Sequence, residues 1–285
     1  MEWNETPVER ARAFAEQPVI MHGQQGKLYG VFTPPAPEVP PAGLCAILFG
    51  RNRWWGDRLS VKGARWLAAR GFSCLRFDYH GYGESEGECQ VVESDEPYTE
   101  DALTAIRHMR SNFAQERFVL SGFCFDGRTA LSAVEQEGSA IEAIAVVAAL
   151  PGLTASMYSH PEKANSSVAE ARSVPRVSEN FKQDLRTLAS SRVKCLFLYG
   201  ADDVEYHNFQ LAERSLLAQL EPAERARLMV EVWPGKVHVA EDSDRMREIT
   251  ERVLSWIDGL RQRPHNSVQP SPAPCGPDVR NGLRT

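Results

Sequence analysis

The sequence lacks the features that would place it outside ordinary globular proteins. Its 285 residues are 42% hydrophobic and 25% charged, which excludes collagenous, disordered and disulfide-scaffold classes. No hydrophobic run approaches the roughly 18 residues of a membrane span. The opening residues, MEWNETPVERARAF, contain no apolar signal-peptide core. We therefore expect a cytoplasmic protein that does not interact with membranes.

The sequence also lacks an excess of positive charge. Lys and Arg number 32 against 38 Asp and Glu, which gives a formal net charge of -6. Proteins that bind phosphate backbones or anionic lipids need a basic face, and the sequence shows none. We therefore expect no nucleic-acid partner.

Cysteine is sparse and unpaired. The six cysteines are spread singly, without a CxxC pair, so neither a zinc site nor a disulfide framework is indicated and we expect no metal. Three of them, Cys45, Cys74 and Cys195, fall inside apolar strand-like runs and are typical of small core residues. Cys124 lies outside such a run and needs another explanation.

What the sequence does contain is an alternation of two patterns. A hairpin is predicted in PVIMHGQQGKLYGVFTPP. From residue 44 onward, apolar runs such as LCAILF, SCLRFDY, RFVLSG and VKCLFLYG alternate with helix-period stretches. Such alternation predicts βαβ units. The expected fold class is therefore α/β, with a mostly parallel central sheet and helices on both faces.

The alternation also predicts the organisation of the chain. It breaks at about residues 151–191, which are polar and interrupted by proline, and we expect a small lid insert there. The core is then formed by residues 1–150 and 192–262. Residues 263–285 are rich in proline, serine and asparagine, and we expect a disordered tail.

The main chemical signal follows the run RFVLSG. There the sequence turns through Gly122-Phe123-Cys124-Phe125-Asp126-Gly127 into a helix, the strand-turn-helix context in which a nucleophile elbow is found. Such a strained turn needs small neighbours, and glycine at 122 suits the close approach. The following helix aims its positive end at Cys124, which stabilises a thiolate. The alternative is that Cys124 is only a buried cysteine beside a glycine turn.

Two downstream loops favour the catalytic reading. Gly200-Ala201-Asp202-Asp203 follows one predicted strand, and Pro234-Gly235-Lys236-Val237-His238 follows the next. Nucleophile, acid and histidine then occur in the chain order of this fold. We expect His238 to exchange a proton with Cys124, and Asp203 to orient the imidazole and balance its charge.

Some alternatives remain open around this triad. Asp202 competes with Asp203 for the acid position, and His207 is a candidate spare base. Asp126 stands where the elbow usually has a second glycine, and it is either a site residue or a cap of the helix that it begins. His80, in FDYHGYGES, is expected to order a loop.

An oxyanion hole needs two backbone N–H groups. One is expected from Phe125, directly after the nucleophile. The second is expected from the loop after LCAILF, with Arg51 as first choice and Asn52 as second. In the same loop Arg53, Trp54 and Trp55 are candidates for substrate contact, or the two tryptophans simply pack against the lid.

These motifs resemble the α/β-hydrolase superfamily over the stretch from Leu44 to about Leu260, through FDYHGYGESEG, GFCFDG, GADD and PGKVH. The stretch ILFGRNRWWGDRLSVKGARWLAARGFSCLRFDYHGYGESEGE is similar to hydrolases associated with exosortase systems and to hydrolase-like proteins of polyketide clusters. Cysteine at the elbow resembles dienelactone hydrolases and tetramate-forming Dieckmann cyclases. Other relatives, in tetronate pathways, eliminate acetate. This sequence departs from the usual pattern in having Cys124, in having Asp126 instead of glycine, and in lacking a histidine before Gly50.

The resemblance implies an enzyme without a cofactor that acts on a small ester or thioester, with an acyl group carried on Cys124. The substrate could be bound to a carrier protein in specialised metabolism. Hydrolysis or acyl transfer is the leading expectation, and cyclisation or elimination is the second. A third hypothesis is a catalytically silent binding module, in which Cys124 would lie beyond hydrogen-bond reach of His238.

Overall fold

A computed structural model describes residues 15–50, 58–89, 97–152, 177–216, 219–238 and 243–261. The described residues build a central eight-stranded sheet with helices on its two faces. Its strands are β1 (Gln17–Gly23), β2 (Gly26–Thr33), β3 (Cys45–Leu48), β4 (Ser73–Phe77), β5 (Phe118–Phe123), β6 (Ile141–Val147), β7 (Lys194–Gly200) and β8 (Leu228–Trp233).

The strand order is β1-β2-β4-β3-β5-β6-β7-β8. The hairpin β1–β2 joins the sheet through an antiparallel pairing of β2 with β4. From β4 to β8 every neighbouring pair is parallel. This topology confirms the expected α/β fold with a mostly parallel sheet.

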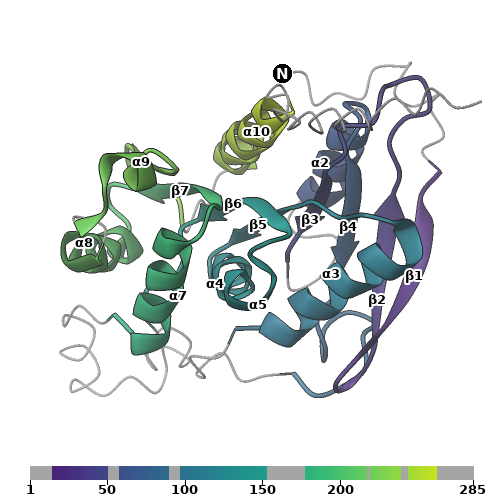
Figure 1. Cartoon of the computed structure of the whole chain (residues 1–285), viewed down its shortest axis with the longest axis horizontal. Helices are drawn as coiled ribbons and strands as arrows, with labels where there is room; N and C mark the ends of the chain where they lie inside the picture. The colour runs from purple at the N-terminus through teal and green to yellow at the C-terminus, as the bar shows by residue number, and fades with distance from the viewer. Residues whose placement is uncertain are drawn as a thin grey trace, which may run out of the picture.

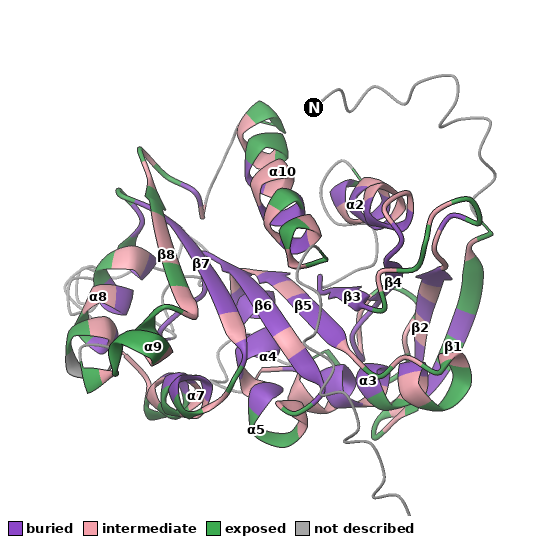
Figure 2. Cartoon of the chain, turned by 45° about the horizontal axis from the view of Figure 1, so that its top comes forward, coloured by how far each residue is buried: buried purple, intermediate pink, exposed green. Residues whose placement is uncertain are grey.

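The helices form two layers. Figure 2 shows α2 and α10 on one face of the sheet, and α3, α4, α5 and α7 on the other. The helices are α2 (Leu59–Ala68), α3 (Thr99–Phe113), α4 (Phe125–Ser132), α5 (Val134–Glu137), α7 (Glu179–Ser190), α8 (Val204–Leu216), α9 (Pro222–Arg225) and α10 (Ser243–Leu260).

The burial of the strands explains this layering. β3 and β4 are buried at every position, and β6 at all but one, as expected for parallel strands covered on both faces. Cys45 in β3, Cys74 in β4 and Cys195 in β7 are fully buried, which confirms their assignment to the core. Burial raises the pKa of all three thiols.

The predicted lid needs a correction at its C-terminal end. Residues 179–190 of the expected insert form α7, whose Phe181, Leu185 and Leu188 are buried in the hydrophobic core. Their spacing of four and three residues gives the helix one apolar stripe, and α7 contacts α4 and α5 beneath the sheet. This helix therefore belongs to the core of the α/β fold. Residues 153–176, like the expected tail at 263–285, lie outside the described residues.

The described residues contain neither a membrane-spanning helix nor a metal-binding cluster. Among the helices in the described ranges, none combines the length and the apolar character needed to cross a bilayer. Within the same ranges, no group of three or more His, Cys, Asp or Glu side chains is arranged to hold a metal ion.

The placement of α7 can be tested by stability. Phe181→Ala removes a fully buried ring and should lower the free energy of unfolding by about 3–5 kcal/mol. Gln183→Ala, at an exposed position of the same helix, should change it by less than about 0.5 kcal/mol. Urea denaturation of both variants measures the difference. Equal, small effects would show that α7 does not belong to the core.

Candidate active site

The candidate site is built around a sharp turn between β5 and α4. Cys124 sits at this turn with φ 57° and ψ -118°, a region that a non-glycine residue occupies only when the surrounding structure holds it there. Its N–H donates to the carbonyl of Val147 on β6 (2.7 Å), and its own carbonyl accepts from the N–H of Gly127. The turn therefore has the geometry of a nucleophile elbow.

The glycine before the elbow is required by space. A Cβ at Gly122 would lie 2.3 Å from both the carbonyl carbon and the carbonyl oxygen of Asp126, closer than any real contact. A Cβ at Gly127 would lie 2.9 Å from a methyl carbon of Val146. Both glycines let the first turn of α4 press against the sheet, which explains the GFCFDG spacing.

His238 meets Cys124 from the loop after β8. Its Nε2 lies 2.8 Å from Sγ of Cys124, within hydrogen-bond reach. Its ring also lies nearly parallel to the ring of Phe123, with an angle of 18° and centroids 6.2 Å apart. The structure thus brings together the two residues that the sequence analysis assigned to proton exchange.

The other ring nitrogen meets a different acid from the expected one. Oε1 of Glu205, in the first turn of α8, lies 3.1 Å from Nδ1 of His238, and the Glu205 side chain is only 3% exposed. The assignment of Asp203 to this position was wrong. No spacing motif distinguished Glu205 in the sequence, because it lies two residues beyond the GADD loop inside a helix.

Asp203 instead holds the backbone of the site. Its carboxylate accepts hydrogen bonds from the N–H groups of Gly200 (2.8 Å), Val237 and His238 (both 3.1 Å). The short Asp203 side chain, just after β7, lies close enough to these amides to bind them. The longer side chain of Glu205 is the one that reaches the imidazole. Asp203 therefore joins the loops after β7 and β8.

The competing candidates are exposed. The side chain of Asp202 faces solvent, and its N–H donates to the carbonyl of Gly235. His207 is also exposed, on α8. His80 is buried, and its Nδ1 and backbone N–H both contact Oδ2 of Asp101, which fits the expected loop-ordering role.

Charge around His238 favours its protonated form. Burial by itself opposes a charged ring, but the hydrogen bonds and negative charges of Cys124 and Glu205 outweigh it and raise the pKa of His238 to about 10. The ring is therefore an imidazolium at neutral pH, held between sulfur on one side and a carboxylate on the other. This is the arrangement that serves a proton donor beside a nucleophilic sulfur.

One of the two expected oxyanion donors is described. Phe125 is the first residue of α4, so its N–H points out of the helix end without an intrahelical acceptor. The expected second donor, Arg51, lies outside the described residues, as do the candidate substrate contacts Asn52, Arg53, Trp54 and Trp55.

Asp126 is buried beneath the elbow, with 4% of its surface exposed. It lies in the first turn of α4, where a negative charge is favoured by the helix dipole. Burial, reinforced by the charge of Asp126, raises the pKa of Tyr79 well above its ordinary value. The aspartate therefore interacts with Tyr79 in the core beneath the elbow, and α4 carries an acidic side chain where the usual elbow has glycine.

The pKa of His238 offers a direct test of this geometry. Cys124→Ala should lower it, because the sulfur's hydrogen bond and negative charge are lost. A pH titration of the histidine ring signals by NMR measures the change. Cys89→Ala, which alters an exposed cysteine, should leave the titration near 10. The same pKa in all three proteins would contradict the Cys124–His238 contact.

The fold is similar to that of several solved structures. No curated protein matches the chain. An esterase from Pyrococcus furiosus is 16% identical with a TM-score of 0.59, over 88% of this chain and 97% of its own. An α/β serine hydrolase without a lid, from Xanthomonas campestris, is 16% identical with a TM-score of 0.53, over 87% of this chain and 92% of its own. A thermostable carboxyl esterase from Bacillus coagulans, with glycerol bound, is 12% identical with a TM-score of 0.57, over 87% of this chain and 100% of its own.

The family follows from the sequence match. Residues 41–204, more than half of the chain, match the family model described as serine aminopeptidase, S33. The strand order, the elbow and the helix layers agree with that assignment. The chain therefore belongs to the S33 serine aminopeptidase family of the α/β-hydrolase superfamily and is a hydrolase-like enzyme.

Proposed function

We propose that this protein acts on an ester or thioester by covalent catalysis, with Cys124 as nucleophile, His238 as proton carrier and Glu205 as the acid that orients the imidazole. The observation that carries the proposal is the 2.8 Å contact between Sγ of Cys124 and Nε2 of His238 at a nucleophile elbow. A silent binding module would not need this contact. The substrate is a small acyl compound, free or attached to a carrier protein.

The first half-reaction transfers the acyl group to sulfur. The thiolate of Cys124 attacks the carbonyl carbon, and the carbonyl electrons move to oxygen. The N–H of Phe125 and the positive end of α4 stabilise that oxyanion. When the tetrahedral intermediate collapses, the bond to the leaving group breaks and Nε2 of His238 gives it a proton. A thioester on Cys124 and a neutral imidazole remain.

The second half-reaction uses the change in charge. Acylation removes the negative sulfur that helps to raise the pKa of His238. The neutral ring can then take a proton from the molecule that receives the acyl group, the acyl acceptor. The acceptor attacks the thioester, and the Cys124 thiolate leaves. Glu205 balances the imidazolium that forms again. Water as the acceptor gives hydrolysis, and an amine or alcohol gives acyl transfer.

The sulfur at the elbow favours a second candidate reaction. A thioester carbonyl lacks strong resonance donation, so a carbanion in the bound chain can attack it. In such a Dieckmann-type cyclisation the neutral imidazole of His238 takes the proton from carbon, the new carbon–carbon bond closes a ring, and the carbon–sulfur bond breaks to release the Cys124 thiolate. The resemblance to tetronate-pathway enzymes that eliminate acetate points to elimination as a further non-hydrolytic reaction. Only hydrolysis incorporates solvent oxygen into the acid product, so turnover in ¹⁸O-labelled water separates it from these reactions. A role in polyketide tailoring would follow from a cyclised or eliminated product.

A covalent intermediate is the first expected result. Incubation with activated acyl thioesters should add one acyl mass to the protein, and Cys124→Ala should abolish the adduct because the attacking sulfur is gone. Intact-mass spectrometry measures this. Cys89→Ala is the matched control, since it removes an exposed cysteine outside the elbow, and it should still be acylated. An adduct that survives in Cys124→Ala would refute the assignment.

The identity of the acid is a separate prediction. Glu205→Gln should lower kcat by about 10²–10⁴-fold, because the amide cannot balance the imidazolium and favours the wrong tautomer. It should also lower the pKa of His238 and move the high-pH limb of the rate profile below about 10. Asp202→Asn, an isosteric change at an exposed site, should affect neither.

Asp203→Asn distinguishes the two buried acids. Its amide cannot accept all of the backbone hydrogen bonds that the carboxylate accepts, so the melting temperature should fall together with activity. If Asp203→Asn lost activity and shifted the pH profile while Glu205→Gln remained normal, Asp203 would be the acid that serves His238.

A further inference from the structure

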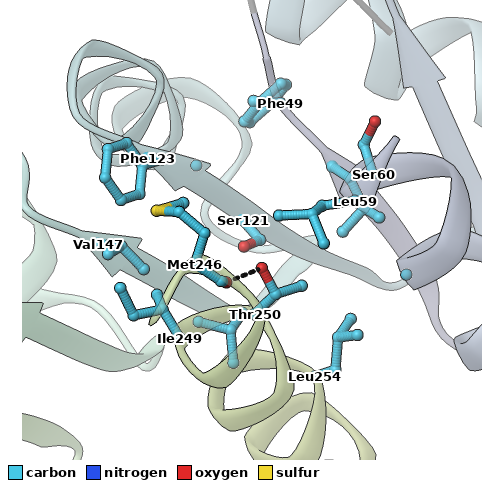
Figure 3. A pocket seen from close by; sticks show the side chains of 14 residues that line it. Phe49, Leu59, Ser60, Ser121, Phe123, Val147, Met246, Ile249, Thr250 and Leu254 are labelled. Carbon is cyan, nitrogen blue, oxygen red and sulfur yellow. Dashed lines mark hydrogen bonds between the residues drawn. The ribbon is translucent and has the colours of Figure 1, made fainter. Parts of the chain in front are cut away.

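An apolar cavity lies beside the elbow, on the α2–α10 face of the sheet. Figure 3 shows its wall: Met246, Ile249, Thr250 and Leu254 from α10, and Leu59 and Ser60 from α2. The ends of β3, β5 and β6 complete it. Its volume is about 70 Å³, and it is partly open to solvent.

The chemistry of the described part of the wall favours an uncharged occupant. Among the described residues that line the cavity, none has a charged side chain, so these residues give no compensation for the hydration that a carboxylate or phosphate would lose there. Thr250 is already engaged, because its hydroxyl donates to the carbonyl of Met246 at 2.8 Å. The wall consists mainly of aliphatic and aromatic groups, and Met246 is a side chain that adapts readily to different shapes.

The cavity adjoins the reactive residues. Gly122 and Phe123, which line it, directly precede Cys124. The ring of Phe123 also stacks beside the ring of His238, so one aromatic side chain contacts both the cavity and the proton carrier. Leu48 and Phe49, at the end of β3, line the cavity from the neighbouring strand.

We propose that this cavity receives the apolar end of the acyl group that is bound to Cys124, and that the enzyme therefore selects short or branched aliphatic acyl substrates. This inference rests on the proposed acyl chemistry. The volume sets the size: an engineered cavity of about 150 Å³ holds a benzene ring, and this one is smaller. An isobutyryl group therefore suits the cavity volume better than the larger benzoyl group.

Gly63 of α2 offers a variant that narrows the cavity without disturbing the fold. A Cβ at this position would lie 3.4 and 3.5 Å from the methyl carbons of Leu254 and 3.7 Å from one of Leu48. These are ordinary van der Waals contacts, and all three residues line the cavity. Gly259→Ala is the matched control, since a Cβ on this glycine of α10 has nothing within 4 Å and the exchange is the same.

The test compares acetyl, isobutyryl and benzoyl thioesters of N-acetylcysteamine. In the unaltered protein and in Gly259→Ala, kcat/KM should be highest for isobutyryl. In Gly63→Ala, the ratio of isobutyryl to acetyl should fall by about tenfold, the usual cost of removing room for a methylene or methyl group from an apolar pocket. Turnover with an unchanged ratio would overturn the cavity proposal and leave the proposed function standing.

A binding measurement keeps the two proposals separate. Isobutyramide is an uncharged analogue that cannot react. In Cys124→Ala protein it should shift the NMR signal of the Met246 methyl group. Adding Gly63→Ala to this protein should weaken the shift, whereas adding Gly259→Ala should leave it unchanged. This response without turnover of any thioester would support the cavity as an apolar binding site and overturn the acyl chemistry. If isobutyramide did not shift the Met246 signal in Cys124→Ala protein, with or without Gly63→Ala, the cavity proposal would be overturned whatever the turnover of the thioesters.

Discussion

The contact between Cys124 and His238 depends on the parallel part of the sheet. The two residues are 114 positions apart in the chain, yet Sγ and Nε2 lie 2.8 Å from each other. Strands β5, β6, β7 and β8 run in the same direction, so their carboxyl ends meet at one edge, where ligands bind in open α/β sheets. The register of these strands therefore sets the distance between sulfur and imidazole.

Two buried acids hold different parts of His238 in place. Asp203 binds the N–H groups of Gly200, Val237 and His238, and so fixes the backbone of both loops. Glu205 lies against Nδ1 and fixes the ring. The loops approach closely at this point: a Cβ on Gly200 would lie 2.5 Å from the carbonyl oxygen of Gly235. The histidine is positioned before any substrate arrives, which reduces the reorganisation that catalysis requires.

The same close approach shapes the other side of the elbow. The positive φ of Cys124 is maintained because Gly122 lets the first turn of α4 lie directly on the end of β5. On the α2–α10 face, Phe123 and Phe49 extend this tight region into an apolar cavity. A cysteine in a strained backbone conformation, a histidine with a raised pKa and a cavity whose described wall is apolar therefore lie beside one another at this edge of the sheet.

The sequence alone determined the class of fold and much of the site. Alternating apolar runs and helix-period stretches predict the parallel sheet, because burial on both faces leaves a continuous apolar signature in each strand. The glycine spacing around Cys124 predicts the elbow, since only small residues allow that turn. Order along the chain then indicates His238 after the last strand. These signals are local, and each is visible within a few neighbouring residues.

Only the tertiary structure decided which acid meets the imidazole, where α7 belongs and that an apolar cavity adjoins the elbow. Asp203 and Glu205 are both acidic and lie two residues apart, and their roles depend on side-chain length and on the distance to the amides of a loop more than thirty residues away. The stripe of α7 indicates an apolar face but not the surface that covers it. Such features arise from contacts between distant segments, and no local pattern in the sequence records those distances.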